Sequence, residues 1–228
     1  MRDAKREHHG RTWSDWAGFL SFVALSAFLV ARSGSIALML LPTLLHEIGV
    51  SATYLFRGRP RATTQGWAPR AVAFGNSFIV LGFMTVAAQW RPEWIAQTES
   101  LLLRDAGFLA WAVGATVGLL PLYHLRRSFS IIPQARELVT SGPYGLARHP
   151  IYALYIVQFC GLWLSHLTLP FTLALVGYFA LLRLRIGYEE AVLTAAFPEY
   201  PAYRARVGAF GPRLPRWARL GDRLPTPA

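Results

Sequence analysis

Long apolar stretches alternate with short polar stretches along most of the chain. A helix needs about 20 mostly apolar residues to cross the hydrocarbon core of a bilayer. The last two apolar stretches meet at Pro170, and proline favours the first turn of a helix. The pattern therefore predicts an all-α, polytopic transmembrane bundle of about six spans that ends in a helical hairpin. The predicted spans cover residues 16–31, 36–56, 71–89, 106–125, 151–168 and 170–187.

The cations gather in alternate connecting segments. If the N-terminus lies inside, all but three of the 23 lysine and arginine residues fall in inner segments, the exceptions being Arg32, Arg91 and Arg104. Cytoplasmic loops carry such an excess of positive residues. We therefore expect a multi-pass membrane protein with both termini in the cytoplasm. The long polar stretches 125–150 and 183–228 would lie on that side, where a water-soluble cofactor would meet the protein.

Composition excludes several other classes of protein. Hydrophobic residues make up 54% of the chain and charged residues 15%, against about 25% charged in an average soluble domain. A single cysteine, Cys160, excludes an intramolecular disulfide and a cysteine-based zinc site. The formal net charge of +11 raises the question of nucleic-acid binding. The arginines flank apolar stretches, however, as membrane topology signals do. We expect membrane lipids as partners, and neither nucleic acid nor a bound metal.

The polar stretch before the fifth predicted span holds the first group of chemically informative residues. Residues 138–152 read LVTSGPYGLARHPIY. Ser141-Gly142-Pro143 is typical of a turn, and Pro150 is suited to the first turn of the next helix. Backbone N–H groups at a helix start favour a bound carboxylate. Two interpretations remain open: Arg148 and His149 serve a ligand site, or they anchor the helix among lipid headgroups.

A second group, RLRIGYEE, occupies residues 183–190 at the end of the last apolar stretch. Neighbours on a helix lie about 100° apart, so Glu189 and Glu190 cannot share one face. We expect one carboxylate to face the bundle and the other to pair with Arg185 or Arg183; a solvated helix end with ion pairs is the alternative. The amphipathic segment that follows predicts an interfacial helix.

In order and spacing, these motifs resemble the C-terminal half of the isoprenylcysteine carboxyl methyltransferase and phospholipid methyltransferase superfamily, a group of integral membrane enzymes. The family pattern runs approximately LV-x-x-GPY-x-x-x-RHP-x-Y-x-G, a hairpin, then EE-x-x-L-x-x-x-FG-x-x-Y-x-x-Y. The resemblance divides the chain into transmembrane helices (residues 1–125), a methyltransferase core (126–207) and a basic cytoplasmic tail (208–228). Leu154, Pro198 and Gly145 depart from the family pattern.

The resemblance implies methyl transfer from S-adenosylmethionine, bound in a pocket that faces the cytoplasm. It names Arg148 and Glu190 as catalytic candidates, the former to hold a carboxylate nucleophile and the latter to orient the acceptor or accept a proton. The implied acceptor is lipophilic or small: an isoprenylcysteine-like carboxylate, a phospholipid amine or a thiol. By motif position, the cofactor-binding residues are Leu138, Val139, Gly142, Tyr144, His149, Pro150, Tyr152, Glu189 and Glu190.

His46 and Glu47 lie within a predicted span, where ionisable side chains are costly and often functional. Either they form a hydrogen-bonded pair inside the bundle, or they line a substrate-binding pocket together with His124.

Two other functions remain open for the chain. A membrane reductase that uses NADPH on sterols or enones carries a similar RHP-x-Y element, although the GPY and EE motifs favour methyl transfer. A non-enzymatic membrane subunit would use Arg148 and His149 only as anchors.

Overall fold

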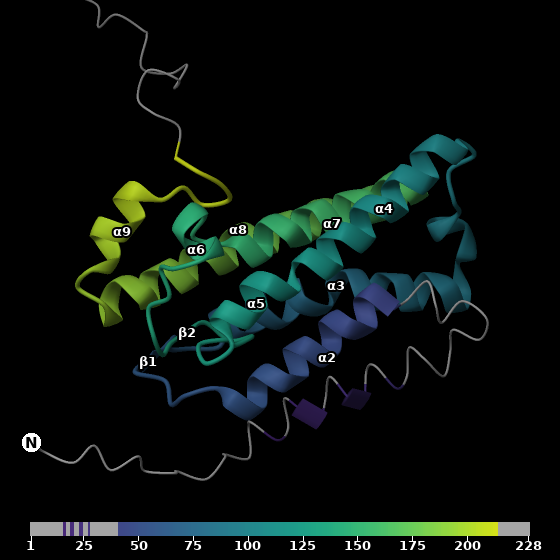
Figure 1. Ribbon diagram of the computed structural model, residues 1–228. Coiled ribbons are helices and arrows are strands. Elements are labelled where there is room, and N and C mark those ends of the chain that lie inside the picture. Colours follow the sequence, from purple (N-terminus) through teal and green to yellow (C-terminus); the bar gives the residue numbers. More distant parts are fainter. Residues whose placement is uncertain (1–15, 17–18, 21–22, 25–26, 28–40, 214–228) are drawn as a thin grey trace, which may run out of the picture.

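The computed structural model describes residues 16, 19–20, 23–24, 27 and 41–213. Most of the first predicted span and of the basic tail therefore lies outside the described residues. Helices dominate the described chain (Figure 1). In chain order the elements are α2 (Leu41–Phe56), β1 (Ala62–Thr63), α3 (Ala68–Trp90), the 3-10 helix η2 (Pro92–Ile95), α4 (Leu101–Val117), α5 (Leu119–Leu125), β2 (Gln134–Ala135), α6 (Pro143–Leu146), α7 (Pro150–His166), α8 (Leu169–Ala196) and α9 (Tyr200–Arg206).

The expectation of a mainly helical protein is confirmed, with one small addition. Strands β1 and β2 pair antiparallel, with Ala62 opposite Ala135 and Thr63 opposite Gln134. Two-residue strands leave no periodic signal in a sequence, so they were not predicted. The pair joins two connecting segments at the end of the bundle where α6 and α9 also lie (Figure 1).

Two helical segments of the described chain are long and apolar enough to cross a membrane. They are Leu101–Leu125, which combines α4 and α5, and Leu169–Ala196, which is α8. At about 1.5 Å per residue, the 28 residues of α8 exceed the roughly 30 Å of a hydrocarbon core. A helix of this length would either extend beyond such a core or lie tilted within it. The count of six spans and the cytoplasmic orientation stay predictions.

Helix α8 continues nine residues past the predicted limit at residue 187. That limit followed the apolar run of the span, whereas the glutamate, leucine and alanine residues beyond it favour helix irrespective of hydropathy. Arg185 and Glu189, one turn apart, add an ion pair of 3.0 Å between Nε and Oε1. The acidic pair therefore lies inside a helix and not at its end.

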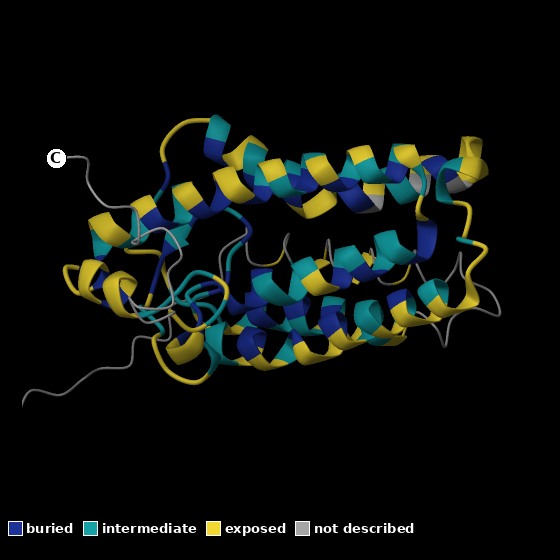
Figure 2. Cartoon of the chain, turned by 90° about the horizontal axis from the view of Figure 1, so that it is seen from above, coloured by how far each residue is buried: buried dark blue, intermediate teal, exposed yellow. Residues whose placement is uncertain are grey.

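The helices pack in a bundle with their buried positions directed inward and their exposed positions on the outer faces (Figure 2). Helix α4 lies along α7, and α3 lies along α8; α2 contacts both α4 and α5. The helix expected over 106–125 begins earlier, because the Ser100 side chain caps it by accepting from the N–H of Leu103. Gly118 separates α4 from α5.

Glycines let α4 and α7 approach closely, as small residues do between membrane helices. A Cβ atom on Gly161 would lie 2.6 Å from the carbonyl oxygen of Gly107 and 2.7 Å from the backbone nitrogen of Trp111. Both contacts are to backbone, so the helices would have to move apart.

We predict that Gly161→Ala lowers the midpoint of thermal unfolding in detergent. Overpacking of this kind costs about 1–3 kcal/mol. Gly187→Ala on α8 is the matched control, because nothing lies within 4 Å of a Cβ at that position. It should raise stability slightly, by about 0.5–1 kcal/mol. An equal loss of stability in both variants would contradict the close approach of α4 and α7.

Candidate active site

A cavity opens at the end of the bundle where α6, α9 and the loop before β2 meet the helices. Its volume is about 210 Å³, somewhat below the roughly 300–1,000 Å³ of typical ligand pockets. Side chains from α2, α3, α7 and α8 form the inner walls, and residues of α6, α9 and the 128–139 segment form the outer ones.

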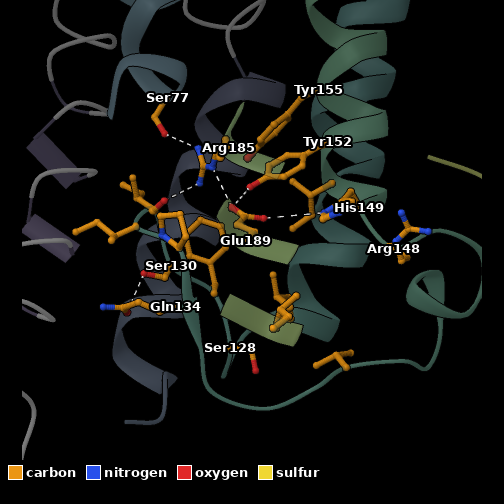
Figure 3. Close-up of a pocket in the computed structure, with 18 of the residues that line it drawn as sticks. Ser77, Ser128, Ser130, Gln134, Arg148, His149, Tyr152, Tyr155, Arg185 and Glu189 are labelled. Atoms are coloured by element: carbon orange, nitrogen blue, oxygen red, sulfur yellow. Dashed lines mark hydrogen bonds and ion pairs between the residues drawn. The ribbon is translucent and has the colours of Figure 1, made fainter. Parts of the chain in front are cut away.

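Glu189 is held toward this cavity by two neighbours. Arg185 Nε donates to Glu189 Oε1 at 3.0 Å, and the Tyr152 hydroxyl donates to the same oxygen. The Arg185 guanidinium also lies 5.3 Å from the centroid of the Tyr152 ring, within the range of a cation–π contact. Figure 3 shows both side chains converging on the carboxylate. The second oxygen, Oε2, lies 4.0 Å from His149 Nδ1 and keeps capacity to accept hydrogen bonds.

Arg185 also ties α8 to two other parts of the protein. Its NH1 donates to Ser77 Oγ at 2.9 Å, and its NH2 donates to the Ile131 carbonyl at 2.9 Å. The sequence indicated Arg185 only as an ion-pair partner. The sequence did not predict that Arg185 is buried, 5% exposed, and links α8 to α3 and to the segment before β2. An arginine within a predicted apolar span was the available signal.

Glu190 faces away from Glu189 and contacts a largely different set of side chains. Its Oε1 accepts from Arg148 Nε at 2.9 Å and from His149 Nε2 at 3.1 Å, while its Oε2 lies 3.2 Å from Arg204 Nε. Arg148 donates further to the carbonyl of Val207. In Figure 3 the Arg148 guanidinium points away from Glu189. The Arg148–Glu190 pair therefore fastens the segment after α9.

One expectation about the start of α7 is corrected. The backbone N–H of Arg148 donates to the Gly208 carbonyl at 2.8 Å, and that of His149 donates to the Ala209 carbonyl at 2.8 Å. These two N–H groups are therefore already hydrogen-bonded within the protein and are not available to a ligand carboxylate. The cause is the return of the chain after α9, which forms a parallel bridge between Ala147 and Gly208.

Most of the residues predicted from the sequence lie around the cavity. His46, Glu47 and Arg148 line it, whereas Glu190 is not among the described lining residues. Gly142 and Pro150 are likewise not among them. Their binding and catalytic roles stay predictions. The cofactor candidates that line the cavity are Leu138, Val139, Tyr144, His149, Tyr152 and Glu189.

His124 lies beneath the Gly142 turn and is not among the described residues of the cavity wall. Its Nδ1–H donates to the Leu120 carbonyl at 2.9 Å. Gly142 has a φ of 58°, in the region that favours glycine, and a Cβ there would collide with the His124 ring at 2.5 Å. The structure thus gives His124 a place in shaping the turn.

His46 does not form the expected pair with Glu47. Its two ring nitrogens are engaged by the Ala115 carbonyl at 3.2 Å and by the Tyr155 hydroxyl at 2.9 Å. Neither ring nitrogen of His46 is therefore available to hydrogen-bond the Glu47 carboxylate.

Two tyrosines of α9 line the cavity, in the segment after the acidic pair that by itself predicted an interfacial helix and that the family resemblance placed at the cofactor pocket. The Tyr203 hydroxyl donates to the Tyr144 carbonyl at 2.6 Å. Burial raises the pKa of Tyr203 to about 12, so the hydroxyl keeps its proton at neutral pH. The Tyr200 hydroxyl is buried and has no hydrogen-bond partner among the described residues. The spacing Tyr-x-x-Tyr after the acidic pair was the signal for both.

Residues 106–200, from α4 to the first residue of α9, match the model of the phospholipid methyltransferase family. This segment is similar to that family. It contains the GPY, RHP and EE motifs and most of the cavity wall. The family lies within a superfamily of integral membrane methyltransferases.

Two relatives extend the comparison. The cobalt-zinc-cadmium resistance protein CzcN of Cupriavidus metallidurans is 36% identical over 141 residues, which cover 60% of this chain and 60% of that protein. The nickel-cobalt-cadmium resistance protein NccN of Alcaligenes xylosoxydans xylosoxydans is 37% identical over 143 residues, covering 60% of this chain and 61% of that protein. The similarity thus spans about three fifths of each relative.

We predict that Glu190→Gln releases the segment after α9. Removing one partner of a largely buried ion cluster is strongly destabilising, so trypsin should cut after Arg204 or Arg213 roughly tenfold faster or more. The matched control is Glu199→Gln, which changes an exposed carboxylate nearby. Equal cleavage rates in the two variants would show that Glu190 does not hold this segment.

Proposed function

We propose that this chain is an integral membrane methyltransferase that uses S-adenosylmethionine and acts on a lipophilic acceptor. One observation carries the proposal. Tyr152 of the RHP motif and Glu189 of the EE motif, 37 residues apart, are hydrogen-bonded at the wall of one cavity, inside the segment that matches the family. Motifs that served only as helix anchors would not need to converge on a hollow.

The groups around the outer part of the cavity fit this cofactor chemically. S-adenosylmethionine supplies a methyl group on a positively charged sulfonium. An aromatic face such as that of Tyr144 suits a cation. The free capacity of Glu189 suits the hydroxyls of a ribose, and the unpartnered, buried Tyr200 hydroxyl supplies a donor or acceptor to an incoming ligand.

In this proposal the protein contributes mainly position and the exclusion of water. Arg185 and Tyr152 fix the orientation of the Glu189 carboxylate, and the Glu190 cluster holds α9 against the cavity. Holding reactants in line supplies a large part of a transfer reaction's acceleration. The acceptor would arrive from the bilayer side, where His46 and Glu47 reach the cavity. Multi-pass topology and a cytoplasmic cofactor site belong to the same proposal.

We predict that S-adenosylhomocysteine, the demethylated cofactor, binds the purified chain in titration calorimetry and raises its unfolding midpoint. Glu189→Gln should weaken this binding about tenfold or more, because a hydrogen bond to a charged group is lost. Glu93→Gln, an exposed carboxylate in η2, is the control and should bind as the wild type does. Stabilisation by NADPH and not by S-adenosylhomocysteine would instead favour the reductase.

The names of the two relatives suggest a setting in metal tolerance, and we include it in the proposal. Among the described residues, no group of three or more His, Cys, Asp or Glu side chains is placed to hold a metal ion. We expect that deleting the gene increases sensitivity to cobalt, zinc or cadmium salts in growth assays. The wild-type chain should restore growth and Glu189→Gln should not. If the Glu189→Gln variant restored growth fully, metal tolerance would not depend on the proposed methyl transfer.

A further inference from the structure

A second hollow, a groove of about 510 Å³, runs between α2 and α5. The two helices lie side by side (Figure 1). The residues of α2 that line the groove are spaced three and four apart and therefore share one helix face; they are Gly49, Ala52, Thr53 and Phe56. None of the described residues of the groove lines the cavity of the candidate active site. The groove is thus a separate site.

The groove is narrow at one end and open at the other. A Cβ atom on Gly49 would lie 2.9 Å from Leu119 Cδ2, so the two helices are in close contact at the narrow end. At the open end, Phe56 is 62% exposed and Tyr123 is 61% exposed. The N–H of Gly58 donates to the Arg127 carbonyl at 2.9 Å and fixes the distance between the two helix ends. The hollow therefore has the shape of a wedge that opens outward.

The walls of the wedge are apolar. The Thr53 hydroxyl donates to the Val50 carbonyl of its own helix at 2.6 Å, so it makes no demand on a ligand. Along α5 the walls are Leu119 and Leu122, and Tyr123 follows at the open end. Such walls can contact an alkyl chain closely but offer few hydrogen-bond partners to a polar molecule.

Two arginines, Arg126 and Arg127, line the open end of the wedge. The Arg126 guanidinium lies 4.7 Å from the centroid of the Tyr123 ring, and no carboxylate of the described chain forms an ion pair with it. Arg127 forms an ion pair of 3.4 Å with Glu137, but the two side chains are 63% and 50% exposed. Ion pairs that exposed are weak. Both guanidinium groups are therefore able to bind a phosphate, whose oxygens match their fork of donors.

We propose that this groove binds one anionic phospholipid, with an acyl chain between α2 and α5 and the phosphate against Arg126 and Arg127. An apolar wedge that ends in two cations complements an alkyl chain that ends in an anion, and basic pockets between membrane helices bind anionic head groups in this way. A zwitterionic lipid brings its own cation to the arginines and is disfavoured. The inference rests on the membrane setting of the proposed function and not on methyl transfer, since the groove and the cavity share no lining residue.

Competition between two lipids tests the proposal. The full chain in detergent is mixed with equal amounts of phosphatidylglycerol and phosphatidylcholine that carry the same acyl chains, and the retained lipids are counted by native mass spectrometry. Phosphatidylglycerol should be retained about fivefold more than phosphatidylcholine, or better. Equal retention is the result expected if another protein segment fills the groove, and it would overturn the proposal.

A pair of double variants separates the groove from general attraction between opposite charges. Arg126→Gln with Arg127→Gln should abolish the preference for phosphatidylglycerol. Arg70→Gln with Arg183→Gln removes the same charge from exposed positions on α3 and α8 that are not among the described groove residues, and should leave the preference unchanged. An equal loss in both double variants would refute a specific site.

A third variant tests the acyl-chain part of the site. Ala52→Phe places a ring in the wedge and should remove the retained phosphatidylglycerol, although both arginines are still present. Full retention in the folded variant would show that the arginines bind head groups without the groove, which would also overturn the proposal. The arginine variants change exposed side chains only, so they decide the question if Ala52→Phe does not fold.

Titration with S-adenosylhomocysteine keeps the two hypotheses apart. The Arg126→Gln, Arg127→Gln double variant should bind it as the wild type does, because neither arginine is among the described residues of the cavity wall. Loss of the lipid preference in the wild type refutes the lipid site alone. Failure of S-adenosylhomocysteine to bind the wild type refutes the proposed methyl transfer, and a preference for phosphatidylglycerol in the same protein still supports the lipid site.

Discussion

A guanidinium buried inside a helix bundle constrains everything around it. Arg185 would be very costly at its depth without partners, since a charge removed from water needs compensating hydrogen bonds. The compensation comes from three directions: Glu189 on its own helix, Ser77 on α3 and the Ile131 carbonyl in the segment before β2. The rigid fork of donors allows little freedom in their arrangement. Arg185 thereby sets where the loop lies against α8, and with it the outer wall of the cavity.

The adjacent carboxylates divide the work of building the site. Glu189 is directed inward and is held by Arg185 and Tyr152, while Glu190 is directed to the segment after α9 and holds Arg148 and Arg204. Helical geometry alone predicted that the two could not share a face. It could not predict which cations Glu190 would gather, because that depends on the return of the chain to residues 147–149 after α9.

The apolar pattern located α3, α7 and the start of α8 well, because each is a sustained hydrophobic run in a helix. It did not indicate where α8 ends, because helix formers continue the helix past the apolar run, and it could not predict strands of two residues. The motifs indicated much of the cavity wall. Gln158 and Tyr178 were missed because each stands alone in an apolar span, where nothing in the sequence separates a packed polar residue from one that faces a hollow. Only the packing of α2, α7 and α8 brings them together with Glu47.

The central claim is that the two motifs enclose one S-adenosylmethionine site. Photocrosslinking of the cofactor, tritiated in its methyl group, to the purified chain followed by peptide mapping tests it directly. The account predicts label in the peptides that contain residues 138–152 and 183–203, and its loss when excess S-adenosylhomocysteine is added. Label that resists competition, or that maps only to other helices, would contradict it.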